Sequence, residues 1–301
     1  MKNMNQVMGA GLWFLIVILS IIWGASFFFV EIAVERMTPL TIVLYRVGFA
    51  SFLLLGFVWF TGRKMPKNIG IWGAFLVIGV LNNVIPFSLI AWGQKYIDSS
   101  LASILNATTP VFSVILAHFL TKDEPLTTNR LTGVLFGWMG VAVLIGIEAL
   151  SGVGMKIAGQ AAVLCAAMLY AFAAIFGRRF KEFDPVVVAA GMLTGSFIIM
   201  IPLTFMMEQP LALDPTPVTW AALFGLSAVS TALAYIIYFH VLSRAGATNI
   251  LLVTFLIPVS AIFLGMMVLG EAPGWNVFAG MALIFMGLIF IDGRLLKRFK
   301  K

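Results

Sequence analysis

Long apolar segments without charged residues alternate along this chain with short loops. They cover residues 3–30, 47–62, 68–94, 99–121, 131–147, 157–177, 185–207, 215–243, 245–270 and 272–291. A helix needs about 20 apolar residues to cross the hydrocarbon of a bilayer. The second segment reaches this length if it begins near Pro39 and includes Arg46. The pattern therefore predicts an all-α integral membrane protein with ten transmembrane helices.

The basic residues of the predicted loops gather on one side of the membrane. Fifteen Lys and Arg share a side with the N-terminus, three (Arg36, Lys95 and Lys156) lie on the other, and Arg46 within a span completes the nineteen. Cytoplasmic loops carry the excess of Lys and Arg. Both termini are therefore predicted to be cytoplasmic, in a multi-pass protein of the plasma (inner) membrane. The net charge of +7 reflects this topology and does not indicate nucleic-acid binding.

Composition narrows the function class. Hydrophobic residues make up 61% of the chain and charged residues only 10%, too few to cover a soluble protein of this size. The sequence shows no phosphate-binding glycine loop, no clustered metal ligands and no nucleophile–base set. We therefore expect no ATPase activity, no metal, no cofactor and no enzymatic function.

The second half of the sequence repeats the first. A shift of 148 residues, with a one-residue slip in the last span, matches Trp72 with Trp220, Pro110 with Pro258, Glu124 with Glu271, Gly133 with Gly280 and Gly140 with Gly287. We assign residues 1–150 to a first five-helix repeat and residues 151–301 to a second, with a short basic cytoplasmic tail. Because each repeat holds an odd number of helices, the second must enter the membrane inverted. Inverted repeats are common in secondary transporters, whose substrate site lies near the midplane between the halves.

Several sequence blocks carry a family resemblance. They are IIWGASFF in the first span, LYRVGFA in the second, and the two blocks that contain Pro110 and Pro258, each followed by Glu–x(8)–Gly. The chain resembles the EamA type of the drug/metabolite transporter superfamily over essentially its whole length. The resemblance implies ten helices, cytoplasmic termini, a central cavity and export of amino acids or other small metabolites. Where many relatives carry a lysine at the end of the first span, this chain has Glu31.

Polar residues within spans are candidate substrate ligands, because hydrocarbon cannot satisfy them. Thr231, Tyr235 and Tyr238 follow i, i+4, i+7 spacing and share one helical face. Asn83 and Phe87 occupy the positions equivalent to Thr231 and Tyr235 in the first repeat. We predict that these residues line a cavity for a polar or aromatic solute, and interhelical hydrogen bonding is the alternative.

The two mid-span prolines are candidate hinges. Pro110 and Pro258 leave the carbonyls of Asn106 and Thr254 without a helical donor. These carbonyls and their side chains are predicted to line the cavity, together with Thr109. The alternative is a kink that hydroxyls such as that of Thr109 satisfy locally.

Two further pairs complete the candidates. Trp23 and Tyr170 are repeat partners that can stack on a ligand and still donate a hydrogen bond, and core packing is the alternative. Arg46 lies about 10 Å inward from Pro39 at the helical rise, and Glu31 ends the first span on the same side. A structural Glu31–Arg46 pair is the leading interpretation, and a contact between Arg46 and a substrate carboxylate is the alternative.

The function that these features predict is secondary transport of a small metabolite, with an amino acid or a related compound as the exported substrate. A passive channel that uses the same cavity is the second hypothesis, and a membrane-embedded enzyme is the third. The expected partners are a small-molecule substrate and the lipid bilayer. The chain is expected to be a monomer or a weak homodimer, since Gly133 and Gly137 form a single GxxxG pair.

Overall fold

The computed structural model describes residues 9–121, 126–146, 154–245, 250 and 253–292, and the regular structure within these ranges is helical. Nine of the described helices are long and apolar enough to cross a membrane, and a shorter apolar helix spans Val253–Leu269. Together they confirm the predicted all-α architecture of ten segments. The predicted boundary between the repeats, at residues 150 and 151, lies outside the described residues.

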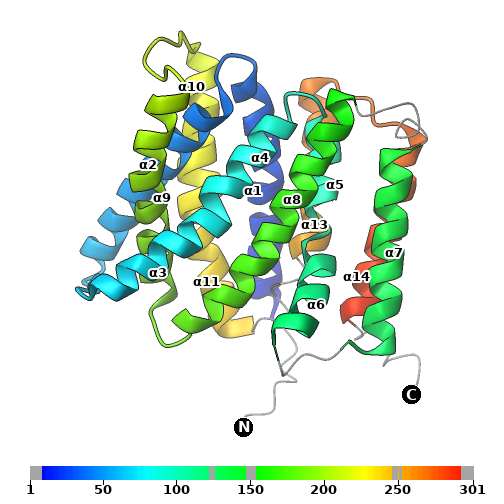
Figure 1. Ribbon diagram of the computed structural model, residues 1–301, viewed down its shortest axis with the longest axis horizontal. Coiled ribbons are helices and arrows are strands. Elements are labelled where there is room, and N and C mark those ends of the chain that lie inside the picture. Colours follow the sequence, from blue (N-terminus) through cyan, green and yellow to red (C-terminus); the bar gives the residue numbers. More distant parts are fainter. Residues whose placement is uncertain (1–8, 122–125, 147–153, 246–249, 251–252, 293–301) are drawn as a thin grey trace.

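The first five spans alternate in direction along the bundle (Figure 1). They are α1 (Ala10–Val34), α2 (Pro39–Phe60), α3 (Ile69–Gly79) with the π-helix η1 (Val80–Val84) and α4 (Ile85–Gly93), α5 (Ser99–Asn106) with α6 (Thr109–Leu120), and α7 (Thr128–Ile145).

The second five spans follow the same plan. They are α8 (Met155–Gly177) with the 3₁₀ turn η3 (Arg178–Phe180), α9 (Pro185–Met207), α10 (Pro217–Phe224) with the π-helix η4 (Gly225–Leu233) and α11 (Ala234–Ala245), α13 (Val253–Leu264) with the π-helix η5 (Gly265–Leu269), and α14 (Trp275–Asp292). The helix α1 begins, and α14 ends, at the same end of the bundle (Figure 1).

The helix contacts agree with an inverted two-fold relation between the repeats: each contact recurs between the equivalent helices. The α1–α13 pair corresponds to α8 against α5 and α6, and the α4–α8 pair corresponds to α1 against α10, η4 and α11. The α2–η4 contact corresponds to α9 against α3 and η1. The α2–α9 and α7–α14 pairs map onto themselves. This packing confirms the two inverted repeats.

Glycines set the close approach of α7 and α14. A Cβ added to Gly133 would lie 2.5 Å from the carbonyl oxygen of Gly287, and one added to Gly140 would lie 2.7 Å from that of Gly280. Gly133 aligns with Gly280 and Gly140 with Gly287, so the two-fold axis exchanges the two contacts. Small residues allow such backbone contact between membrane helices.

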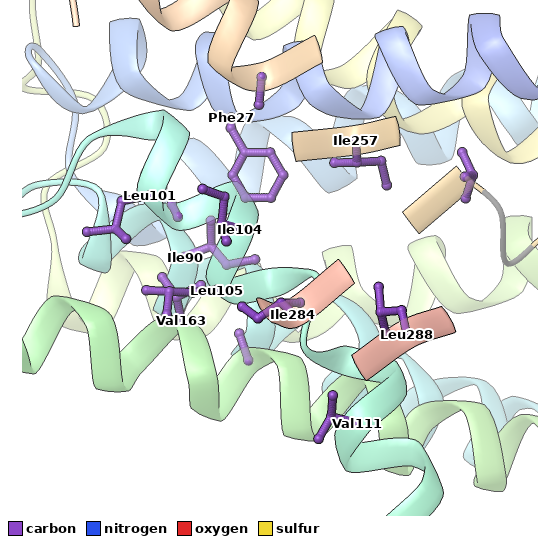
Figure 2. Packing of buried hydrophobic residues seen from close by; sticks show 14 of the residues in the cluster. Phe27, Ile90, Leu101, Ile104, Leu105, Val111, Val163, Ile257, Ile284 and Leu288 are labelled. Atoms are coloured by element: carbon purple, nitrogen blue, oxygen red, sulfur yellow. The ribbon is translucent and has the colours of Figure 1, made fainter. Parts of the chain in front are cut away.

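The largest hydrophobic cluster joins helices of both repeats. Figure 2 shows it through side chains from α1, α4, α5, α6, α8, α13 and α14, among them Phe27, Ile90, Leu105, Val111, Val163, Ile257 and Ile284. A second cluster lies between α2 and α9 and reaches η1 and α11. Tyr170 packs against both clusters and therefore lies where they meet.

Candidate functional site

Two π-helical segments hold equivalent polar residues in the interior. The segment η1 shifted by 148 residues falls within η4, and it aligns Asn83 with Thr231. Asn83 is 0% exposed and Thr231 is 1% exposed. Short π segments insert a residue into a helix and are frequent at functional sites. The repeat therefore reproduces this irregularity on both sides of the interior.

The Arg46 side chain of α2 points toward η4 and is 7% exposed. Its Nε donates a hydrogen bond to the Thr231 hydroxyl at 3.0 Å, and its guanidinium carbon lies 3.5 Å from the centre of the Phe87 ring. This cation–π contact offsets part of the cost of burying the charge. A guanidinium carries five N–H donors. Among the described residues we find no second hydrogen bond from this group.

An amide–phenol network lies beside Arg46. Asn82 Nδ2 donates to the Tyr235 hydroxyl at 2.9 Å and to Asn83 Oδ1 at 3.2 Å. Asn83 Nδ2 donates to the Ser196 hydroxyl at 3.0 Å. The network thus connects η1 of the first repeat with α9 and α11 of the second.

Aromatic residues of α1, α8 and α11 lie next to this polar cluster. Tyr170 lies close enough to Arg46 and Tyr235 to interact with them electrostatically. The rings of Trp23 and Tyr238 are 5.5 Å apart, and the Ser230 hydroxyl of η4 donates to the Ile22 carbonyl of α1 at 2.8 Å. Contacts with one another or with Arg46 therefore join seven predicted site residues in one region of the interior: Trp23, Asn83, Phe87, Tyr170, Thr231, Tyr235 and Tyr238.

The predicted Glu31–Arg46 pair is not formed in this structure. Glu31 Oε2 accepts a hydrogen bond from Gln94 Nε2 at 2.7 Å, whereas Arg46 donates to Thr231. Glu31 lies in the last turn of α1, while Arg46 lies two turns inside α2 and faces η4. This difference in depth and direction separates the two side chains.

The two predicted hinges differ. In the fourth span α5 ends at Asn106 and α6 begins at Thr109, so Pro110 lies in the first turn of α6 and not in a helix interior. The Thr109 hydroxyl donates to the Asn106 carbonyl at 2.8 Å, which is the predicted local alternative. Pro258 lies inside the continuous α13. Thr254 precedes it by one turn. In the described part of the chain, Thr109 bonds within its own span and the buried Asn106 Oδ1 has no hydrogen-bond partner, so hydrogen bonds join neither residue to the Arg46 cluster.

Two carboxylates of the second repeat bind helix N-termini of the first. Glu271 accepts from the backbone amides and hydroxyls of Ser99 and Ser100 at the start of α5. Glu208 accepts from the Thr38 and Thr41 hydroxyls and from the first amides of α2. A carboxylate is favourable at a helix N-terminus. Both contacts join the repeats at the end of the bundle predicted to be extracellular. Glu124, the repeat partner of Glu271, lies outside the described residues.

Three polar side chains with interior partners were not predicted from the sequence, and two of them, Gln94 and Ser196, are fully buried. Asn82 and Ser196 belong to the network, and Gln94 binds Glu31 and the Phe27 carbonyl. Asn82 was detectable, because it is polar within an apolar segment and adjoins Asn83. The partners of Ser196 and Gln94 depend on tertiary packing, which the sequence pattern does not show.

The chemistry of the cluster favours binding rather than a reaction. It offers one guanidinium, hydroxyls, amides and aromatic rings, which can hold an anionic or polar organic molecule. Groups of three or more His, Cys, Asp or Glu able to hold a metal are absent from the described part of the chain.

Comparison with known proteins extends these observations. The chain is 28% identical to the inner membrane transporter YedA of Escherichia coli (91% of this chain, 88% of that protein) and 23% identical to the transporter YoaV of Bacillus subtilis (91% and 94%), both described as uncharacterized. A crystal structure of a protein with 17% identity superposes with a TM-score of 0.69 and covers 96% of this chain and 99% of that one, which supports the fold. The model of the EamA-like transporter family matches residues 11–146 and again residues 157–292, so the chain belongs to this family of membrane transporters.

Proposed function

We propose that the protein exports an amino acid or a related small carboxylate-bearing metabolite by alternating access, and that Arg46 binds the substrate carboxylate. The observation that carries this proposal is a buried guanidinium whose hydrogen-bond partner is a hydroxyl and not a carboxylate. A buried cation without a paired anion is costly. A substrate carboxylate would supply the missing anion and could accept two parallel N–H bonds.

The surrounding side chains suit the rest of such a substrate. Asn82 and Tyr235 offer amide and phenol groups to a polar substituent, and Phe87 and Tyr170 offer aromatic surface. Because Arg46 and Thr231 are buried here, substrate entry requires the helices that cover them to move. That requirement is met by alternating access between two repeats of similar structure.

Counterflow in proteoliposomes tests the proposal. A panel of amino acids, the matching amines without a carboxylate, and nucleosides identifies substrates that stimulate exchange of a labelled compound. Arg46→Gln should lower carboxylate transport about tenfold or more, since charge-assisted hydrogen bonds contribute about 1.5–3 kcal/mol. Arg46→Lys should keep part of the activity. Ser88→Ala, which removes a hydroxyl that donates to the Val84 carbonyl within its own helix, is the control.

Two outcomes would reject parts of the proposal. If Arg46→Gln lowers transport of carboxylates and amines equally, the guanidinium has a structural role. If uptake of the labelled compound shows no trans-stimulation, the protein is a channel or passive facilitator.

A further inference from the structure

A cavity of about 360 Å³ lies between the third and sixth spans, and its lining residues are different from those of the Arg46 cluster. Its lining residues are Leu81, Phe172, Ile175, Phe176 and Arg179. The helix α8 packs along α4 but makes few contacts with α3, so the two spans diverge toward the end that carries Arg179. The cavity lies in the space between the two diverging spans.

The cavity opens on the outer surface of the bundle. Val77 and Ile85, one turn on either side of Leu81, are 45% and 39% exposed. On α8 the exposed Cys165 precedes Phe172 by seven residues, which places both on one helical face. Within a membrane-spanning segment, an exposed face of this kind contacts lipid.

One cation lies at the end of this apolar cavity. The guanidinium carbon of Arg179 is 3.7 Å from the centre of the Phe176 ring, and among the described residues we find no hydrogen bond or ion pair to this side chain. Arg178 and Lys181 add positive charge in the same loop, which is predicted to be cytoplasmic. An apolar cavity with a guanidinium at its interfacial end is complementary to a lipid with an anionic headgroup.

We infer that this cavity binds an anionic phospholipid, with an acyl chain between α3 and α8 and the headgroup phosphate on Arg179. Guanidinium groups bind phosphate through paired N–H bonds. Basic pockets between membrane helices on the cytoplasmic side recognise anionic headgroups. Leu81 belongs to η1, the segment that also holds Asn82 and Asn83. The acyl chain would therefore contact the segment that carries part of the polar network.

Native mass spectrometry of the delipidated full-length protein tests the inference. Phosphatidylglycerol and phosphatidylcholine with identical acyl chains are titrated separately. We expect one phosphatidylglycerol to bind about fivefold more tightly than phosphatidylcholine, the ratio that one interfacial basic residue provides. Arg179→Gln should remove this preference, and Arg179→Lys should retain part of it. Leu81→Trp should fill the cavity and weaken binding of both lipids.

The matched control is Lys67→Gln, which removes one charge from a predicted cytoplasmic loop and leaves the cavity intact. It should keep the lipid preference. Equal affinities of the parent protein for the two lipids would overturn the inference, and so would an equal loss in Lys67→Gln and Arg179→Gln. Displacement of the bound lipid by millimolar inorganic phosphate would instead assign the site to a free anion and would also overturn it.

Discussion

The fourth and ninth spans have equivalent sequences but different conformations. The fourth is interrupted at Ala107 and Thr108, whereas α13 continues through the equivalent residues Phe255 and Leu256. The fifth and tenth spans, by contrast, make exchanged contacts that obey the two-fold symmetry. The molecule therefore combines a symmetric frame, made of the α7–α14 and α2–α9 pairs, with two equivalent spans, the fourth and the ninth, that differ in conformation.

The positions of the two prolines bear on whether this asymmetry can reverse. Proline in the first turn of a helix removes no hydrogen bond, but proline in a helix interior costs about 3 kcal/mol. In this structure Pro110 lies in the first turn of α6, and Pro258 lies in the interior of α13. If the repeats exchange conformations, the cost moves from the ninth span to the fourth. We therefore expect the two states to have similar free energies, as alternating access requires.

The largest expected effect comes from disturbing the symmetric frame. Gly140→Leu would place a side chain against the backbone of Gly280, where even a Cβ lies only 2.7 Å from the carbonyl oxygen. The backbone cannot move aside as a flexible side chain can. We therefore expect the free energy of unfolding to fall by more than about 3 kcal/mol, and little folded protein to form. The yield of monodisperse protein in size-exclusion chromatography measures this loss.

The control for this substitution is Gly56→Leu in α2, where an added Cβ meets no atom within 4 Å. It should fold in normal yield. If Gly140→Leu folds as well as Gly56→Leu, the contact between α7 and α14 does not hold the frame.

The next effect concerns the prolines and has opposite signs in the two repeats. Pro258→Ala should stabilise the described state, because it removes a proline from the interior of α13. Pro110→Ala should favour the exchanged state, in which the fourth span would be continuous. Each shift is up to about 3 kcal/mol, so each variant should slow transport while it preserves folding.

Cysteine accessibility measures the direction of each shift. Single cysteines at Asn83 and Thr231, in a background with Cys165→Ser, are labelled with an impermeant reagent from either side of the membrane. The two proline variants should change labelling in opposite directions. Identical labelling in both variants and the parent, with unchanged transport, would make the prolines static features.

A smaller effect is expected at the junction between Glu271 and α5. Glu271→Gln keeps the shape of the side chain but removes the charge that accepts bonds from Ser99 and Ser100, and we expect a loss of about 2 kcal/mol. Burial and the nearby Glu271 carboxylate also raise the pKa of Asp98, so the variant should lower that pKa. Thermal unfolding in detergent and accessibility of a cysteine at Ser103 measure the two consequences.

Glu208→Gln provides the comparison, because it weakens a similar contact on α2, which belongs to the frame. It should lower stability without a change in accessibility at Ser103. If the two variants behave alike, Glu271 stabilises the fold but does not hold the interrupted span in place.

Much of the fold could be predicted from the sequence, because the bilayer imposes a simple pattern on it. Ten apolar segments, the distribution of loop charges and the alignment of Gly133 with Gly280 follow from local sequence. The interruption at Asn106 could not be predicted, since the equivalent sequence at Thr254 remains helical. The same pattern is compatible with both conformations, and only packing selects one.

The sequence was enough to predict which residues belong to the candidate site, but not which residues they bond to. Asn83, Thr231 and Tyr235 are identifiable as polar residues in apolar segments, and the structure gathers them at one level. The predicted partner of Arg46 was wrong, because the rotation of α2 about its own axis decides whether Arg46 faces Glu31 or Thr231. Rotation of a helix buried on several sides leaves no clear periodic signal.

The smallest predicted effect lies at the predicted cytoplasmic end of the frame, where Asp184 caps α9 and pairs with Arg63 at 2.8 Å. Burial opposes ionisation of Asp184, but the hydrogen bonds from Arg63 and the first amides of α9 outweigh it and lower the pKa of this carboxyl. A lowered pKa in the folded state stabilises the protein above the unfolded value of about 3.9, and this stability is lost as the pH falls through the folded pKa. Because both side chains are more than a third exposed (35% and 40%), the contribution should stay below about 1 kcal/mol. Asp184→Asn should therefore lower the unfolding temperature by a few degrees at pH 7, and this difference should disappear only as the pH falls below the lowered pKa of the folded state. Cysteine labelling at Asn83 and Thr231 should stay as in the parent. Glu182→Gln, which removes the exposed ion-pair partner of Lys181, should change neither quantity. A change in labelling in Asp184→Asn would show that the α2–α9 pair takes part in the exchange of states and is not a fixed frame.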